Sequence, residues 1–298
     1  MNTGYFNKKY AQAVVQKPDI IYFPKSEGFL IQRAIKESNF IDLINCYPLF
    51  CCNHWEHICT EISLLPDNIV STCLIIDPFA DLPLKKLANY FDIFKLFKPH
   101  YVVNFNKNRQ PSKHHRQEIK RAYAKNIVIT HCQEPLDFLD VWYQLYLNLI
   151  KKHQITENKI FSKSLFFNQF EILGFYAFRA TINDLTIAMS LWYVSKSFAY
   201  YHQNANSSMG YKTGASYALM DYSLNFFEKI GVTKALLGSS AGLKYSKNDG
   251  LSKFKSGWVN EILSSYIAGK INNPEMYEKL LKQAITKKPH NFFPAYRS

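Results

Sequence analysis

Between residues 200 and 258 the chain reads Tyr200-Tyr-His-Gln-Asn204, then Met209-Gly-Tyr-Lys-Thr-Gly214, and at its end Gly250-Leu-Ser-Lys-Phe-Lys-Ser-Gly-Trp258. This stretch decides the fold, because its pattern predicts a strand, a glycine-rich turn, a helix, a second strand and a loop, in that order. A helix that begins just after a strand offers an anion its free N–H groups and the positive end of its dipole. The stretch therefore predicts an anion-binding site at the glycine-rich turn.

Two side chains in this stretch are candidates for chemistry. His202 can serve as a general base, since the reference pKa of histidine lies near neutrality. The alternative, which is commoner for a lone histidine, is a hydrogen-bonded structural role. Strand alternation predicts that Tyr200, His202 and Asn204 share one face. Lys255 lies in the loop and can stabilise negative charge on a reacting group, although a plain surface loop explains its position as well.

The composition favours an anionic partner. The 298 residues carry a formal net charge of +13, which suits a nucleic acid, a nucleotide cofactor, a phosphorylated precursor or a membrane surface. A solvated, lysine-rich surface explains the same charge equally well. Six cysteines without a disulfide-framework spacing, no signal-peptide pattern and no apolar run of membrane-spanning length predict a reduced, cytoplasmic protein without a transmembrane segment.

Helices and strands are interleaved along the chain, with antiparallel hairpins in its second half. Apolar spacing predicts helices over residues 28–38 and 84–97, and strands over 175–180, 186–194 and 197–203. This order is typical of an α+β, mixed-sheet architecture. We place two lobes at residues 1–134 and 135–298, and a final helix over 274–288 is a candidate to pack back on the first lobe.

A basic segment covers residues 107–125 and contains a predicted helix that Ser112 caps. Its Arg116 and Lys120 lie on the polar face and are candidates to grip phosphates, while a solvated outer face is an equal alternative. The run Cys51-Cys-Asn-His-Trp-Glu-His-Ile-Cys59 supplies thiols and imidazoles, but its spacing matches no zinc pattern. A helix that begins near Asn53 explains this run better, and we expect no metal.

Taken in order, these motifs resemble the FemAB-like proteins, a branch of the GNAT acyltransferase superfamily. The resemblance rests on a tyrosine-rich strand at residues 199–202, the turn at 210–216, a helix that ends at Gly231 and a strand that ends at Gly238. It also rests on the Gly-Leu, Phe-Lys and Gly pattern of residues 250–257, and on the basic helix before a strand at residues 116–122.

The resemblance implies two tandem GNAT-like lobes with mixed, mostly antiparallel sheets flanked by helices. It also implies acyl transfer to an amine. FemAB-type members use aminoacyl-tRNA to extend peptidoglycan precursors, and related members are thought to use acyl thioesters such as acyl-CoA. We therefore expect an N-acyltransferase that moves an acyl or aminoacyl group from an anionic donor, with acyl-CoA favoured, to a small-molecule or envelope-precursor amine. Aminoacyl-tRNA stays open as the donor.

The expected site follows from this reading. The catalytic candidates are His202 and Lys255. The donor-binding candidates are Tyr201, Asn204, Gly210, Tyr211, Lys212 and Gly214. The substrate-binding candidates are Tyr200, Ser239, Lys253, Phe254, Arg116 and Lys120. A different class of function also stays open, namely a non-catalytic basic module that binds RNA or a glycolipid head group through its many aromatic side chains. A first lobe that only scaffolds the second is a third possibility.

Overall fold

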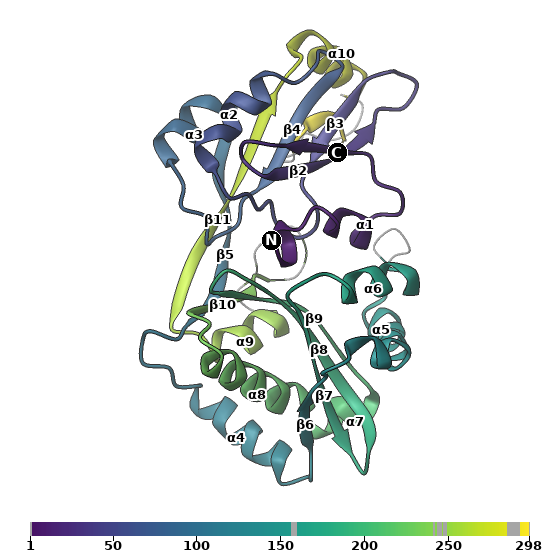
Figure 1. The fold of residues 1–298 in the computed structure, drawn as a ribbon, viewed down its shortest axis with the longest axis vertical. Coiled ribbons are helices and arrows are strands. Elements are labelled where there is room, and N and C mark those ends of the chain that lie inside the picture. Colours follow the sequence, from purple (N-terminus) through teal and green to yellow (C-terminus); the bar gives the residue numbers. More distant parts are fainter. Residues whose placement is uncertain are drawn as a thin grey trace. The chain divides into compact units, whose positions relative to one another are not determined.

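The structure is a computed structural model that describes residues 2–155, 160–240, 242, 246, 249–284 and 293–297 (Figure 1). The chain folds into two compact units. Unit 1 comprises Met1–Asn7 and Pro99–Leu263, and unit 2 comprises Lys8–Lys98 and Ser264–Ser298. Two long strands, β5 (Ile93–Asn104) and β11 (Glu261–Ile271), each begin in one unit and end in the other.

The sheet of unit 1 has the strand order β5-β10-β9-β8-β7-β6. Besides β5, its strands are β6 (Val128–His131), β7 (Phe175–Ile182), β8 (Leu185–Ser195), β9 (Phe198–Asn206) and β10 (Lys234–Gly238). Strands β9 and β10 are parallel, whereas β5 with β10 and the run from β9 to β6 pair antiparallel. The three strands predicted between residues 175 and 203 are therefore confirmed as β7, β8 and β9.

Helices cover both faces of this sheet. They are α4 (Lys113–Tyr123), α5 (Leu139–His153), α6 (Lys163–Phe170), α7 (Ser208–Thr213), α8 (Ala215–Lys229) and α9 (Gly250–Ser256), with the 3-10 turns η1 (Gly4–Phe6) and η2 (Pro135–Phe138). Figure 1 shows α4 beside α8, and α5 beside α6. Neighbouring residues of β8 belong to two separate hydrophobic cores. Trp192 packs against Phe227 of α8, whereas Leu191 belongs to the core that contains Trp142 of α5. This central strand is therefore buried on both faces.

The strands of unit 2 belong to the same 11-stranded mixed sheet, and they continue it in the order β1-β2-β3-β4-β11-β5. Its further strands are β1 (Ile20–Phe23), β2 (Gly28–Ala34), β3 (Ile41–Ile44) and β4 (Ile69–Ile75), and its helices are α1 (Tyr10–Val14), α2 (Trp55–Ser63), α3 (Leu84–Tyr90), α10 (Pro274–Ala284) and η4 (Ala295–Arg297). Strands β3 and β4 are parallel, and β11 is antiparallel to β4. Helix α10 belongs to this unit and contacts β4. Residues 285–288 of the predicted final helix lie outside the described residues.

A buried carboxylate fastens the described C-terminal residues to unit 2. The side chain of Asp42, on β3, has no exposed surface. It accepts a hydrogen bond from the Ser71 hydroxyl at 2.9 Å and is contacted by the Tyr296 hydroxyl and the Arg297 Nε–H. The Arg297 guanidinium also donates to the carbonyl of Ala34 at 2.8 Å. We call this cluster the C-terminal clasp.

The compact units do not coincide with the lobes expected from the sequence. Strand β6 ends just before residue 134, yet it pairs with β7, which begins well after that point. Both sides of the expected boundary therefore lie in unit 1, and the divisions fall inside β5 and β11 instead. The expected fold class, an α+β arrangement of mixed, mostly antiparallel sheets flanked by helices, is confirmed.

Three local expectations are wrong. Residues 28–34 form the strand β2 and not a helix. Phe29, Leu30 and Ile31 are all buried, and a strand with such a run does not show the alternation that identifies a strand in a sequence. The helix expected over 84–97 ends at Tyr90, and β5 begins at Ile93. The loop expected at 250–258 is instead the helix α9, which Asp249 caps by accepting a 2.9 Å hydrogen bond from the Ser252 amide.

Candidate active site

Strands β9 and β10 pair side by side and then part. Their recorded parallel pairing runs from Phe198 with Lys234 to Tyr200 with Leu236. Strand β9 continues to Asn206 and β10 to Gly238, and no pairing between these continuations is recorded in the described part of the chain. Two parallel strands that diverge expose backbone N–H and C=O groups to the gap between them, as a sheet edge does. An extended ligand can hydrogen-bond to such groups.

A β-bulge in β9 lies at this point of divergence. Leu191 of β8 faces Gln203, and the next residue, Trp192, faces Tyr201, so His202 is the extra residue. A bulge bends its strand and re-aims the side chains that follow it. The expected alternation therefore fails after His202: Asn204 donates to Ser216 of α8 at 3.2 Å, whereas His202 points to Tyr5.

His202 is buried and hydrogen-bonded through both ring nitrogens. Its Nδ1 lies 3.0 Å from the Tyr5 hydroxyl, and its Nε2 lies 3.0 Å from Oε1 of Gln169. Because an amide oxygen only accepts, Nε2 carries the proton, and Nδ1 accepts from Tyr5. Burial lowers the pKa of His202 to about 3, so the ring is neutral and only weakly basic near pH 7. This geometry favours the structural alternative over the expected role as general base.

Asparagine side chains gather at the start of α8. Ser216, in the first turn of this helix, accepts a hydrogen bond from Asn206 at 3.0 Å and returns one to Oδ1 of the same side chain at 3.1 Å. Asn204 donates to the same hydroxyl. Gly214 joins α7 to α8 with a φ of 74°, a left-handed conformation that favours glycine. The predicted donor-binding residues Asn204 and Gly214 are thus brought together at a helix N-terminus.

The short helix α7 is held closely against β8. A Cβ added at Gly210 would lie 2.3 Å from the Ile187 carbonyl oxygen, so only glycine fits there. The half-exposed ring of Tyr211 lies 3.1 Å under the Lys152 ammonium of α5, a cation–π contact. Lys212 is exposed, and its carbonyl accepts from Lys125 of α4 at 3.1 Å. The three donor-binding candidates of this turn therefore differ in access, and Tyr211 and Lys212 are open to solvent.

Lys255 is buried at the end of β10. Its ammonium donates to the Ser239 carbonyl at 2.8 Å, and a Cβ added at Gly238 would lie 3.2 Å from Nζ. The amino group thus adjoins the strand end at which β10 leaves β9. A lysine is rarely buried without a reason, because its charge loses hydration. Ser239, which was expected to bind substrate, is the residue whose carbonyl accepts the hydrogen bond from this ammonium.

A second buried histidine fixes the helix that carries Lys255. His115 of α4 accepts a hydrogen bond at Nδ1 from the Ser112 hydroxyl at 2.9 Å, and its Nε2–H donates to the Phe254 carbonyl at 2.7 Å. Its ring packs edge-on to Trp258 at 5.0 Å. Burial lowers the pKa of His115, which keeps the ring neutral. The sequence showed His115 only as part of an apolar helix face, so its bond to the residue before Lys255 was not expected.

Three side-chain oxygen atoms of residues in β9 and just after β10 are buried without a hydrogen-bond partner among the described residues. They are Oε1 of Gln203, Oδ1 of Asn204 and Oγ of Ser239. Two of these side chains lie on β9 beyond its pairing with β10, and the third follows β10. A buried polar atom without a partner costs about 1–3 kcal/mol.

Of the remaining site residues predicted from the sequence, some are packed inside the protein and others are exposed to solvent. Tyr200 and Tyr201 are packed, the first against Tyr5 at 5.2 Å and the second against Trp192 at 4.8 Å. Phe254 packs beside His115. The exposed candidates are Lys253, Arg116 and Lys120. Arg116 bonds to the carbonyl of Pro111, and no recorded contact brings the exposed three to Lys255.

The described residues contain no group of three or more His, Cys, Asp or Glu side chains arranged to hold a metal ion. All six cysteines are buried free thiols. In the same described part of the chain, no helix is both long enough and apolar enough to cross a membrane.

Known structures share this fold. No family model and no curated protein matches the chain. A structure of FemX superposes with a TM-score of 0.66 at 12% identity, covering 91% of this chain and 93% of FemX. The C-terminal domain of a putative lysylphosphatidylglycerol synthetase from Agrobacterium fabrum gives 0.63 at 10% identity, covering 95% and 92%. L-PGS from Bacillus licheniformis gives 0.62 at 12%, covering 91% and 90%. The chain therefore shares its fold with FemX and with these two synthetase structures, as the resemblance to FemAB-like proteins implied.

Proposed function

We propose that this protein is an N-acyltransferase that moves an acyl or aminoacyl group from an activated donor to an amine. The observation that carries the proposal is the buried ammonium of Lys255 at the end of β10, where β9 and β10 stop pairing. A fixed positive charge in a site sheltered from water stabilises an oxyanion far better than it would in solution. The fold shared with FemX and with the two synthetase structures supports the same class of reaction.

In the proposed reaction the donor lies along the exposed edge of β9, and its anionic part lies at the start of α8 beside Asn204 and Gly214. The neutral amine attacks the donor carbonyl, so a C–N bond forms and the bond to the thiol or ribose oxygen breaks. The carbonyl oxygen becomes negative in the transition state and is stabilised by Lys255. The amine proton passes to water or to the leaving group. Holding both reactants in register supplies much of the rate.

His202 has a different part in this proposal from the one expected. Its neutral ring, held by Tyr5 and Gln169, is the extra residue of the bulge and so fixes the place where β9 bends away from β10. A base with a pKa of about 3 takes little of the amine proton at neutral pH. We therefore expect His202→Gln to change stability more than turnover.

Two donors fit the proposal. An acyl thioester such as acyl-CoA is favoured, since an extended chain suits the edge of a strand and its phosphates suit a helix N-terminus. Aminoacyl-tRNA is the second, favoured by the exposed basic side chains of α4, which include Arg116 and Lys120. The acceptor is an amine on a small molecule or an envelope precursor. A cytoplasmic location remains a prediction.

The first experiment separates these donors. The protein is heated with a series of acyl-CoAs and, separately, with charged tRNAs, and the rise in melting temperature is measured. Products with an amine panel are then followed by mass spectrometry. Stabilisation and transfer with one donor class alone would identify the donor. If tRNA bound with an affinity that falls steeply with salt, and its aminoacyl group was never transferred to an amine, the result would instead support the non-catalytic binding module.

The second experiment tests the lysine. Lys255→Met removes the charge from α9 and keeps a chain of similar length, and we expect turnover to fall about 10²- to 10³-fold. Lys229→Met is the control, because Lys229 is an exposed lysine at the end of α8 that has no part in the proposed site. Circular dichroism and the melting temperature establish that both variants fold. Equal turnover in the two variants would remove Lys255 from the mechanism.

A further inference from the structure

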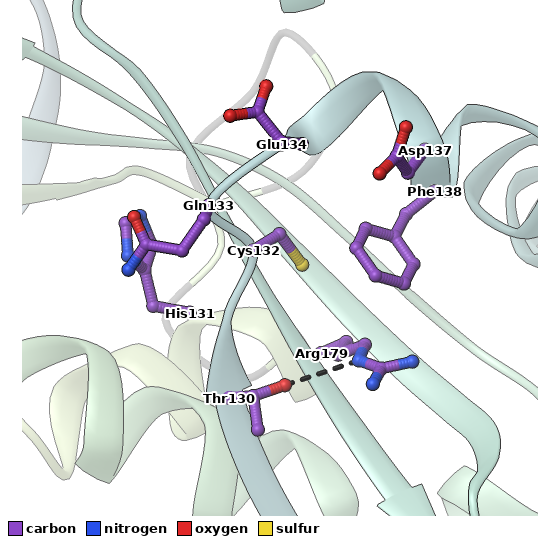
Figure 2. Close-up of a pocket in the computed structure, with 8 residues that line it drawn as sticks. All are labelled: Thr130, His131, Cys132, Gln133, Glu134, Asp137, Phe138 and Arg179. Atoms are coloured by element: carbon purple, nitrogen blue, oxygen red, sulfur yellow. Dashed lines mark hydrogen bonds between the residues drawn. The ribbon is translucent and has the colours of Figure 1, made fainter.

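A separate pocket lies at the other end of the sheet of unit 1. It has a volume of about 300 Å³ and is formed where β6 leads into η2, over the side chain of Arg179 from β7 (Figure 2). Strand β8 lies between β7 and β9, so the pocket is distinct from the proposed acyl-transfer site. A volume of this size is at the lower end of the range for small-molecule sites.

The guanidinium of Arg179 is fixed within this pocket. Thr130 lies directly opposite Arg179 in the β6–β7 ladder, and the Arg179 Nε–H donates to its hydroxyl at 3.2 Å. The guanidinium also stacks over the ring of Phe138 at 4.6 Å, which is a cation–π contact. Figure 2 shows the group held between these two side chains. Among the described residues, no carboxylate is recorded within ion-pair distance of it. Its terminal N–H groups therefore keep the forked geometry that binds a carboxylate.

Two carboxylates stand at the rim of the same pocket. Glu134 and Asp137 are exposed and lie on the segment that closes the pocket above Phe138 (Figure 2). Burial raises the pKa of the Cys132 thiol to about 12 and lowers the pKa of His131, so both of these lining groups are neutral near pH 7. The pocket thus has one cation at its base, two anions at its rim and otherwise uncharged walls.

We propose that this pocket binds a small zwitterion that carries both a carboxylate and an ammonium group, as a free α-amino acid does. The carboxylate pairs with the Arg179 fork, and the ammonium faces Glu134 and Asp137. An anion alone fits less well, because the rim repels it. A cation alone fits less well, because it leaves the guanidinium without its counter-ion. The ring of Phe138 and the thiol of Cys132 provide apolar surface for the rest of the molecule.

The test uses the full chain and a panel of the common amino acids in isothermal titration calorimetry. For each amino acid that binds, the corresponding acid without the amino group and the amine without the carboxylate are also titrated. We expect the zwitterion to bind at least about tenfold more tightly than either analogue. Failure of every amino acid to bind at concentrations up to about 10 mM would overturn the proposal. Equal affinity for an analogue that lacks one of the charged groups would also overturn it.

Variants locate the binding. Arg179→Gln should reduce affinity at least about tenfold, while Arg121→Gln, which removes an exposed arginine of α4 that pairs with Glu118, should leave it unchanged. The double variant E134Q/D137N alters only exposed side chains and should fold whatever the fate of Arg179→Gln. It should weaken the amino acid but not its des-amino analogue. If both variants bound the amino acid as tightly as the wild type does, the binding site would lie elsewhere, and the proposal would be overturned.

Discussion

Acid should destabilise unit 1 through His202. The folded state holds its ring neutral between Tyr5 and Gln169, with a pKa of about 3. In the unfolded chain the same ring has an ordinary pKa near 6.5. Between pH 6.5 and pH 3 the unfolded state therefore binds a proton that the folded state does not bind, and the free energy of unfolding falls as the pH falls.

The size of this effect follows from the shift. Each pH unit below 6.5 is worth at most about 1.4 kcal/mol, so lowering the pH to 4.5 should cost the wild type about 2–3 kcal/mol through this one side chain. His202→Gln has no group that titrates there. Its free energy of unfolding should start lower at pH 7.5, because the substituted side chain makes poorer hydrogen bonds, and then depend less on pH by that amount.

The assay is urea unfolding at a series of pH values from 7.5 to 4.5, followed by tryptophan fluorescence. Tyr5→Phe is the control, because it removes the hydroxyl that bonds Nδ1 but leaves the titrating ring in place. We expect Tyr5→Phe to be less stable throughout and to keep the steep pH dependence of the wild type. Parallel curves for wild type and His202→Gln would refute the reasoning, since they would mean that the folded protein does not hold this ring neutral.

Two further predictions concern packing. Arg297→Ala removes a guanidinium that contacts the fully buried carboxylate of Asp42. Because Arg33 stays 3.9 Å from this carboxylate, we expect unit 2 to lose about 1–3 kcal/mol, measured by chemical unfolding. No change would show that the C-terminal clasp does not contribute to stability. Gly210→Ala places a methyl group against the Ile187 carbonyl and should cost about 1–3 kcal/mol. A melting temperature equal to that of the wild type would show that α7 shifts without cost.

The sequence predicted the second half of the fold better than the first. The strands from residue 175 to 206 are joined by short turns, and a turn signal between apolar runs is local in the sequence. Strand β2 was predicted as part of a helix from the spacing of its apolar residues. In the structure most of this strand is buried, and a short apolar run does not distinguish a buried strand from a helix. Helix α9 was predicted as a loop because it is short and begins with glycine, yet its Asp249 cap is an ordinary helix signal.

The candidate site was predictable only where its residues lie in one stretch. Asn204, Gly214 and Lys255 come from the segment that the sequence already marked. The partners that decide the state of His202 are Tyr5 and Gln169, far away along the chain. No local pattern connects residues at such separations. The bulge at His202 also escaped prediction, because it is a property of the pairing between β8 and β9 rather than of either strand alone.

The order in which the chain is synthesised gives β11 a consequence for folding in the cell. Among the strands of unit 2, β11 lies between β4 and β5, although about half of the chain separates it from β5 in the sequence. The ribosome therefore releases the first strands of unit 2 long before their neighbour exists. Until then the edge of β4 is unpaired, and such edges promote aggregation. By contrast, most of unit 1 is one continuous segment that can begin to fold while the rest is still being translated. We expect nascent chains that stop before residue 264 to need a chaperone, which arrested-translation pull-downs can measure.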